Sequence, residues 1–208
     1  DMTRKEKRQN ELKKLKSMTF KQKVGYIWTY YKGVFAGIII ACVIISIGVQ
    51  MFQNSQLKSL LSIAVVDSNY NHDEQVEALQ NDFLAYAGTG DKHEVVDVDT
   101  SLLSGDDYNA VVKMTVVMGA GTADMMFCGE ETYKKYKQQE AFLSWKEILG
   151  DDYSKYEEYM TDDGRLDLEK CPNWEKYNMV YYSPVYAVVM SSSKNLENCI
   201  KFLEMMVQ

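Results

Sequence analysis

Residues 33–52 read GVFAGIIIACVIISIGVQMF, an unbroken apolar segment in which Cys42 is the one ionisable side chain. At 1.5 Å per residue, about 20 helical residues span roughly 30 Å, the thickness of the hydrocarbon core of a bilayer. A buried core helix seldom carries so long and uniform an apolar run. The sequence therefore predicts a transmembrane helix over residues 33–53, which separates a segment of residues 1–32 from the remaining chain.

Charge is distributed very unevenly about this segment. Residues 1–32 contain ten Lys and Arg against three Asp and Glu, a net of +7, and since the whole chain carries −7, residues 33–208 carry −14. Because basic residues are retained on the cytoplasmic side, residues 1–32 are expected in the cytoplasm as a basic amphipathic segment beside anionic lipid headgroups. The chain is thus expected to be a single-pass protein of the cell membrane, with the bilayer as its first partner and an extracellular C-terminal domain. A nucleic-acid partner is not expected, because no recognition motif accompanies the basic residues.

Two forms of processing compete with an uncleaved signal anchor. A secretory signal has a shorter apolar region of about 7–15 residues and a cleavage site with small residues, which VQMFQNSQ after Gly48 lacks. Ile39-Ile40-Ala41-Cys42 resembles a lipobox, but apolar residues follow Cys42 where a lipoprotein turns polar. The anchor is the favoured interpretation, and processing at Cys42 stays open as the alternative.

Small residues recur at every fourth position near the start of the span, at Gly33, Gly37 and Ala41. This spacing places them on one helix face, where they allow another helix to approach closely. The stripe predicts packing against a membrane-protein partner or a second copy of the chain. The alternative is that the stripe has no partner, since small residues are common in membrane spans.

The acidic part of the chain has the pattern of an α/β domain. After a polar stalk over residues 54–59, the domain of residues 60–208 opens with LLSIAVV, a short apolar run typical of a strand buried on both faces. Further strands are predicted over residues 93–98, 123–128 and 180–190, the last containing Pro184. A helix that ends at Gly88 is predicted after the first strand, with Val76, Leu79, Phe83 and Ala87 on one face. A second helix is predicted to begin at Asp106 or Asp107 and to carry Tyr108, Val111, Val112, Thr115, Val116 and Gly119. Two more are predicted over residues 130–140 and, after the last strand, 195–207. The strand–helix alternation predicts a small parallel βαβαβ sheet covered by right-handed crossovers.

Three cysteines, Cys128, Cys171 and Cys199, lie in this domain. An odd number argues against a disulfide framework. Cys128 and Cys199 are expected to be buried as small apolar residues, and a bridge that involves Cys171 is left open.

Three stretches resemble known proteins. ADMMFCGEETYKKYKQQEAFLSW (residues 123–145) and PVYAVVMSSSKNLENCIKFLEMM (residues 184–206) resemble parts of extracellular solute-binding proteins, and KSMTFKQKVGYIWTYYKGVFAGIII (residues 16–40) resembles the anchor of small N-terminally anchored membrane proteins of Gram-positive gut bacteria. The resemblance implies one lobe of a periplasmic-binding-protein fold. It does not imply two, because only about 40 residues separate the third strand's helix from the return strand, too few for an ordinary second lobe. A single lobe cannot close on a ligand by hinge motion.

Polar residues follow the predicted strands where a parallel sheet binds its ligands, beyond the carboxyl ends of the strands. The candidate ligand-binding residues are Asp67, Ser68 and Asn69 after the first strand, Glu130 and Glu131 after the third, and Tyr182 and Ser183 near the last. The competing interpretation is that these residues only form turns and helix starts, which such side chains favour. The ligand's identity is not predicted.

Motifs for catalysis are weak. The two histidines, His72 and His93, are not accompanied by a G-x-S-x-G or H-E-x-x-H pattern, and no catalytic residue, metal or cofactor is expected. Asp163-Gly164 resembles part of a calcium loop, but Lys170 stands where the loop requires Glu. The sequence favours a non-catalytic extracellular binding or interaction module beside a transporter or other membrane complex. The alternative is the solute receptor of an ABC importer whose cleft a dimer or partner completes, and an unrecognised enzyme is the least favoured interpretation.

Overall fold

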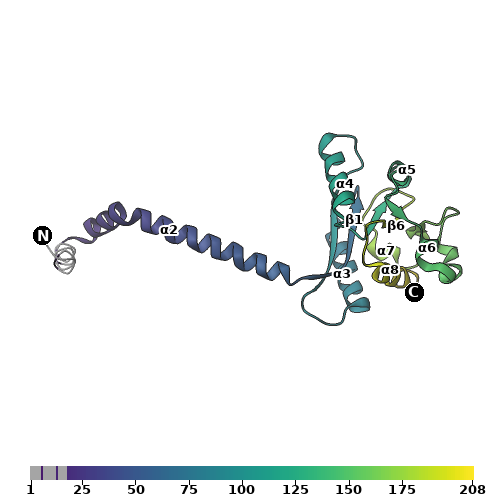
Figure 1. Cartoon of the computed structure of the whole chain (residues 1–208), viewed down its shortest axis with the longest axis horizontal. Coiled ribbons are helices and arrows are strands. Elements are labelled where there is room, and N and C mark those ends of the chain that lie inside the picture. The colour runs from purple at the N-terminus through teal and green to yellow at the C-terminus, as the bar shows by residue number, and fades with distance from the viewer. Residues whose placement is uncertain (1–5, 7–12, 14–17) are drawn as a thin grey trace. The chain divides into compact units, whose positions relative to one another are not determined.

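The computed structural model describes residues 6, 13 and 18–208, which belong to two compact units that meet at Gln56 and Leu57. The main element of the first unit is helix α2, Phe20–Ser55 (Figure 1). Within it, Tyr31–Gln53 is long and apolar enough to cross a membrane, with a mean hydropathy of 2.5 and no part of its most apolar window buried against protein. The apolar helix predicted over residues 33–53 is confirmed: its apolar stretch begins at Tyr31, and the helix that contains it begins at Phe20.

The connection between the two units is short. Helix α2 continues to Ser55 and strand β1, Lys58–Val66, begins three residues later. Residues 54–59, predicted as a polar stalk, are therefore the end of α2, two connecting residues and the start of β1. Every buried residue of the described chain lies in the second unit, between Leu61 and Met206, so that this unit contains a complete core of its own.

The first half of the second unit follows the predicted alternation. Strand β1 leads through helix α3 (Asp73–Ala87) to β2 (Glu94–Leu102), and then through helix α4 (Tyr108–Ala120) to β3 (Met125–Cys128). Strand β1 pairs in parallel with β2 on one side and β3 on the other, which confirms the βαβαβ arrangement. The Asp107 side chain caps α4 by accepting hydrogen bonds from the backbone N–H groups of Asn109 and Ala110, and so it takes the role for which Asp106 was also a candidate.

The second half of this unit consists of short elements between β3 and the C-terminal helix. Its strands and helices are α5 (Glu130–Lys137), β4 (Phe142–Leu143), α6 (Trp145–Leu149), the 3-10 helices η1 (Gly150–Lys155) and η2 (Glu157–Tyr159), β5 (Leu166–Asp167), η3 (Leu168–Lys170), α7 (Trp174–Tyr177), β6 (Tyr186–Met190) and α8 (Leu196–Val207).

The prediction of a wholly parallel sheet is wrong for this half. Strand β6 pairs antiparallel with β3, β4 and β5, so the sheet, ordered β2-β1-β3-β6-β4, is mixed. The physical reason is the connection from β3 to β6, which is built from many short elements in place of one crossover helix and returns the chain in the opposite direction. The last strand is also shorter than predicted, because residues 180–185 with Pro184 precede it as irregular backbone.

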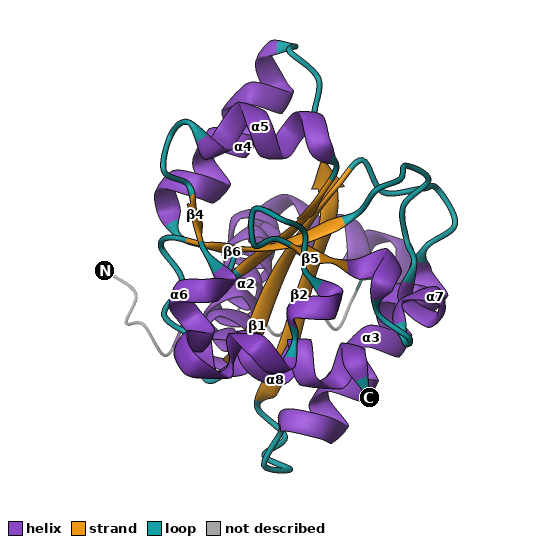
Figure 2. Cartoon of the chain, turned by 90° about the vertical axis from the view of Figure 1, so that its right-hand side faces the viewer, coloured by secondary structure: helices purple, strands orange, loops and turns teal. Residues whose placement is uncertain are grey.

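The sheet has helices on both faces (Figure 2). Along β1, Leu61, Ile63 and Val65 contribute to the core on the face covered by α3, α7 and α8, which we call the α3 side. Ala64 and Val66 point the other way, to the core beneath α4 and α5, which we call the α4 side. Burial on both faces explains why β1 reads as a continuous apolar run.

Helix α4 buries a different set of residues from those singled out in the sequence. The residues that it packs onto the sheet are Ala110, Met114 and Val117. The six residues singled out in the sequence are instead exposed to solvent: Tyr108, Val111, Val112, Thr115, Val116 and Gly119. We call these six residues the outward face of α4.

The cysteines of this unit, Cys128, Cys171 and Cys199, are buried and free. This confirms the expected burial of Cys128 and Cys199, and no bridge forms at Cys171. Desolvation raises the pKa of the Cys128 thiol to about 12, so that it stays protonated at neutral pH.

Candidate functional site

The candidate site lies at the carboxyl ends of β1 and β3. From β1 the chain passes to β2 on one side of it and then to β3 on the other side. The strand order therefore reverses between β1 and β3. Parallel α/β sheets hold ligands in the crevice at this point. Asp67 follows β1 directly here, and Gly129, Glu130 and Glu131 follow β3.

The crevice is occupied by a side chain of the protein itself. The Tyr182 hydroxyl lies 2.9 Å from the carbonyl oxygen of Val66 at the end of β1, to which it donates, and 3.4 Å from that of Phe127 on β3. Burial of the ring raises the pKa of this hydroxyl well above its ordinary value. The ring lies close against Gly129, where an added Cβ would stand 3.2 Å from the nearest Tyr182 carbon. A glycine after β3 therefore leaves the room that Tyr182 needs.

Two of the predicted ligand residues hold the segment that carries Tyr182. Ser68 pairs with Val180 as an isolated bridge, and its hydroxyl donates to the Thr100 carbonyl oxygen at 2.8 Å. The backbone N–H of Asn69 donates to the carbonyl oxygen of Met179 at 2.9 Å. The bridge to Val180 and the bond to Met179 hold the segment of residues 179–182 against the end of β1. Ser68 and Asn69 therefore position the site without lining its cavity.

An open cavity of about 300 Å³ lies beside Tyr182. The other five predicted residues line it: Asp67, Glu130, Glu131, Tyr182 and Ser183. Sequence reasoning missed the other lining residues, which are Ser104, Gly129, Thr132, Tyr181 and Pro184. The signal available for Gly129 was its place directly after a strand, where close backbone approach often requires glycine. Thr132 follows in the first turn of α5 and Ser104 follows β2, whereas Tyr181 and Pro184 are brought in by the returning chain before β6.

The three carboxylates at this cavity differ in their partners. Glu130 accepts a 2.6 Å bond from Arg165 and pairs with Lys134 at 3.1 Å, and the hydrogen bond from Arg165 is the main cause that lowers its pKa. Asp67, which adopts φ +51°, accepts the backbone N–H of Ser104 at 3.0 Å. Within the described residues no cation pairs with Asp67 or Glu131. The cavity mouth therefore combines uncompensated negative charge with the exposed ring of Tyr181.

Arg165 ties this site to the α4 side of the sheet. Its guanidinium lies between the rings of Tyr133 and Tyr186, 4.3 Å and 4.1 Å from their centroids. It also bonds Asp163 at 2.8 Å and Glu130 at 2.6 Å, and its side chain is only 12% exposed. Planar stacking with two carboxylate partners is an arrangement that arginine provides and lysine does not. The cluster locks the start of α5 onto the turn that precedes β5.

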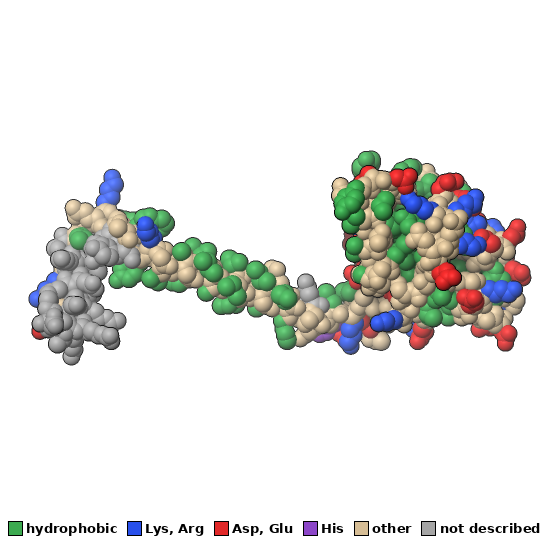
Figure 3. Space-filling view, turned by 45° about the horizontal axis from the view of Figure 1, so that its top comes forward, with side chains coloured by type: hydrophobic (Ala, Val, Ile, Leu, Met, Phe, Trp, Pro, Cys, Tyr) green, Lys and Arg blue, Asp and Glu red, His purple; other side chains and the backbone are tan. Residues whose placement is uncertain are grey.

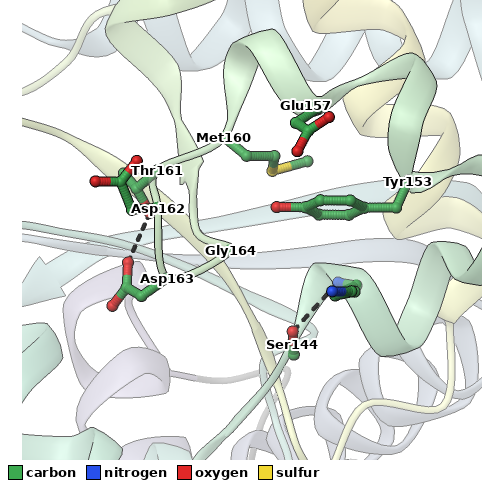
Figure 4. Close-up of a pocket in the computed structure, with 9 residues that line it drawn as sticks. Ser144, Tyr153, Glu157, Met160, Thr161, Asp162, Asp163 and Gly164 are labelled. Carbon is green, nitrogen blue, oxygen red and sulfur yellow. Dashed lines mark hydrogen bonds between the residues drawn. The ribbon is translucent and has the colours of Figure 1, made fainter.

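A second cavity, of about 400 Å³, lies between α6, the 3-10 helices and the Asp162-Asp163-Gly164 turn (Figure 4). Tyr153 extends across it with its hydroxyl toward the turn. Asp163 does not point freely into this cavity, because it accepts hydrogen bonds from Thr161 and Arg165. The residues that resemble a calcium loop thus form a turn closed by their own side chains, and no group of His, Cys, Asp or Glu in the described chain is arranged to hold a metal.

The two histidines make local contacts away from the cavity lining. His93 Nδ1 lies 2.9 Å from an Asp91 carboxylate oxygen, and the His72 ring contacts the carbonyl of Asn69. The buried, protonated thiol of Cys128 is not available as a nucleophile at neutral pH. Neither histidine and none of the three cysteines of this unit lines the cavity.

Comparisons with known proteins return nothing. No family model, curated protein or solved structure matches this chain.

Proposed function

We propose that this chain is a single-pass membrane protein whose second unit, Leu57–Gln208, is a non-catalytic binding or interaction module outside the cell, accessory to a transporter or another membrane complex. The span Tyr31–Gln53 and the basic excess before it support this orientation. We expect the partners of the module to be membrane proteins themselves.

The position of Tyr182 is the observation that carries the proposal. A small-molecule receptor of this architecture leaves the switch-point crevice open for its ligand. Here the Tyr182 hydroxyl takes the hydrogen-bond acceptors at the ends of β1 and β3, and only the open cavity beside it remains. A shallow mouth fits a protruding group of a protein partner better than an enclosed solute. Asp67, Glu131 and the exposed ring of Tyr181 favour a positively charged group.

Photo-crosslinking in native membranes tests this use of the cavity. A photoreactive amino acid at Tyr181, which is 75% exposed, should capture a membrane protein of defined mass. The matched control places the same amino acid at Glu175, an exposed residue of α7 outside the cavity lining. Equal capture at both positions, or capture of lipid alone at Tyr181, would contradict a specific partner site.

Orientation is tested separately by labelling intact cells with a membrane-impermeant maleimide. Tyr70→Cys lies on the second unit and is fully exposed, whereas Lys13→Cys lies before the span. The native cysteines of the second unit are buried and give a low background. We expect labelling of Tyr70→Cys in intact cells and of Lys13→Cys only after permeabilisation, and the reverse pattern would overturn the topology.

The second candidate function is a solute receptor of an ABC importer that completes its cleft with another chain. The location of the cavity at the strand-order reversal favours it. Native mass spectrometry of residues 57–208 separates the two candidates. We expect a species without bound small molecule, and a stoichiometric adduct would favour the receptor.

A further inference from the structure

The outward face of α4 is apolar in a helix that covers a soluble sheet. Tyr108 is 81% exposed, Val112 41% and Val116 56%, and small residues at Thr115 and Gly119 continue the same face. Helix α4 contains no acidic residue, and its one charged residue, Lys113, bonds sideways to Ser101 on β2. Figure 3 shows hydrophobic side chains gathered on this part of the second unit.

The fold itself does not need these side chains. Packing onto the sheet is supplied by Ala110, Met114 and Val117 on the opposite side of the helix. A helix that faces water on one side normally carries polar or charged residues there, and a contiguous exposed apolar patch marks a contact surface.

A lipid surface fits this face poorly. Helices that lie in the membrane interface carry Lys and Arg beside the apolar stripe, which anionic headgroups attract. The border of α4 carries more acidic than basic residues: Asp97 and Asp99 are exposed on β2, and Asp106 and Asp107 precede the helix. Of the lysines nearby, Lys113 bonds Ser101 and Lys135 pairs with Asp106, which leaves Lys194 at the far end. Anionic headgroups would repel this border.

A second copy of the chain fits the same face well. The second unit is strongly acidic, so two copies repel each other over most of their surface, and the outward face of α4 is a region free of charge. The ends of the helix carry opposite charge: Asp107 is exposed at its start beside the Asp106–Lys135 ion pair, which leaves that end net negative, and Lys194 is exposed beside Gly119 and Ala120 at its other end. An antiparallel pair about a twofold axis brings each acidic end to a basic end, and Thr115 and Gly119 allow the helices to approach closely.

We infer that two copies of this chain in one membrane associate through the outward faces of α4, packed antiparallel. The inference rests on the anchoring proposed above. Confinement of both copies to one membrane gives them a high effective concentration. A single helix pair buries less than the roughly 800 Å² per partner of a stable interface. Residues 57–208 alone are therefore monomeric, and the full chain pairs.

Cysteine crosslinking of the full chain in native membranes tests the pairing. Thr115→Cys lies near the middle of the outward face, close to the proposed axis, and its matched control is Ala85→Cys on the exposed side of α3. Under mild oxidation, we expect Thr115→Cys to form a disulfide-linked dimer at least about tenfold faster than Ala85→Cys, because only the former meets its own copy repeatedly. Adding Val116→Asp to Thr115→Cys should remove this difference, because it places two like charges in the contact.

Each result of the experiment decides the inference. Equal crosslinking at Thr115→Cys and Ala85→Cys indicates random collision and overturns it, as does a dimer that Val116→Asp leaves unchanged. A Thr115→Cys adduct with a different mass identifies another protein as the occupant, and quenching of a fluorophore at Thr115→Cys by lipid-borne nitroxide identifies the bilayer. Maleimide labelling of Tyr70→Cys in the same cells shows whether anchoring itself has failed.

Discussion

Helices α3 and α4 perform the same task on opposite faces of one sheet, and yet their outward sides differ. Both connect parallel strands, and both bury a narrow apolar stripe, Leu79 and Phe83 in α3 and Met114 and Val117 in α4. Helix α3 then presents Asp73, Glu74 and Glu77 to water, as expected of a surface helix. Helix α4 presents valines and a tyrosine. The sheet determines the inward side of a crossover helix, whereas the surroundings of the protein determine the outward side.

The two sides of the sheet also differ in how their cores are closed. The α3 side is closed by apolar and aromatic contacts, such as the edge-on packing of Phe127 and Trp174. The α4 side is smaller and is completed by a cation, Arg165, stacked between Tyr133 and Tyr186. Stability on this second side is therefore expected to be sensitive to charge and to pH.

The largest loss of stability is expected from substitutions on the inward sides of the two helices, which both pack onto the sheet. Phe83→Ala on α3 should lower the free energy of unfolding of residues 57–208 by about 3–5 kcal/mol, and Met114→Ala on α4 by about 2–5 kcal/mol, because both side chains are completely buried. Urea unfolding followed by circular dichroism measures both. A negligible loss for Met114→Ala would show that α4 is not packed on the sheet and would break the comparison.

An intermediate effect is expected at Arg165. Arg165→Met should cost about 2 kcal/mol, because it removes two stacking contacts and leaves Glu130 and Asp163 with only the exposed Lys134 and Lys137 as cations. The partial exposure of these carboxylates reduces the loss. The control is Lys155→Met, whose ion pair with Asp152 is well exposed and should contribute about 0–0.5 kcal/mol.

The stability lost in Arg165→Met is also expected to depend on pH. The pKa values of Glu130 and Asp163 are lowered in the folded protein, so their contribution is complete above the unfolded values of about 4 and is lost as the pH falls through the folded values. Between about pH 5 and pH 3, wild-type residues 57–208 should therefore lose stability more steeply than Arg165→Met. Parallel curves for the two proteins would show that Arg165 does not act through these carboxylates.

The smallest effect is expected on the outward sides. In residues 57–208, Val112→Lys on α4 and Glu77→Lys on α3 should each change the free energy of unfolding by no more than about 0.5 kcal/mol, because both side chains face solvent. Thermal unfolding measures the difference. If Val112→Lys alone costs well over 1 kcal/mol, the outward face of α4 is buried within the fold and is no contact surface.

Much of the fold was predictable because its signals are local. The length of the apolar run gives α2, and buried parallel strands read as short runs such as LLSIAVV. Gly88 ends α3, and the Asp107 side chain caps α4. That Asp67 and Glu130 line one cavity was also predictable, since both follow parallel strands, whose carboxyl ends meet at one edge.

The remaining features depend on contacts between distant residues. The antiparallel direction of β6 follows from how the chain returns through residues 129–185, for which no single periodic pattern exists. The position of Tyr182 under Gly129 depends on that return, as does Arg165, which stacks on tyrosines of α5 and β6. The exposure of the valines on α4 was missed because an apolar stripe is ordinarily buried, and composition alone does not distinguish a stripe that faces the sheet from one that faces a partner.

The short connection at Gln56 and Leu57 has a mechanical consequence. The strand that follows it, β1, is an interior strand with a parallel neighbour on each side. A force applied through α2 would enter the sheet at Lys58, where β1 is paired with β2, and would reach the pairing with β3 at Ile63. Pulling β1 out of the sheet would require two ladders of hydrogen bonds to break, whereas an edge strand has only one to lose.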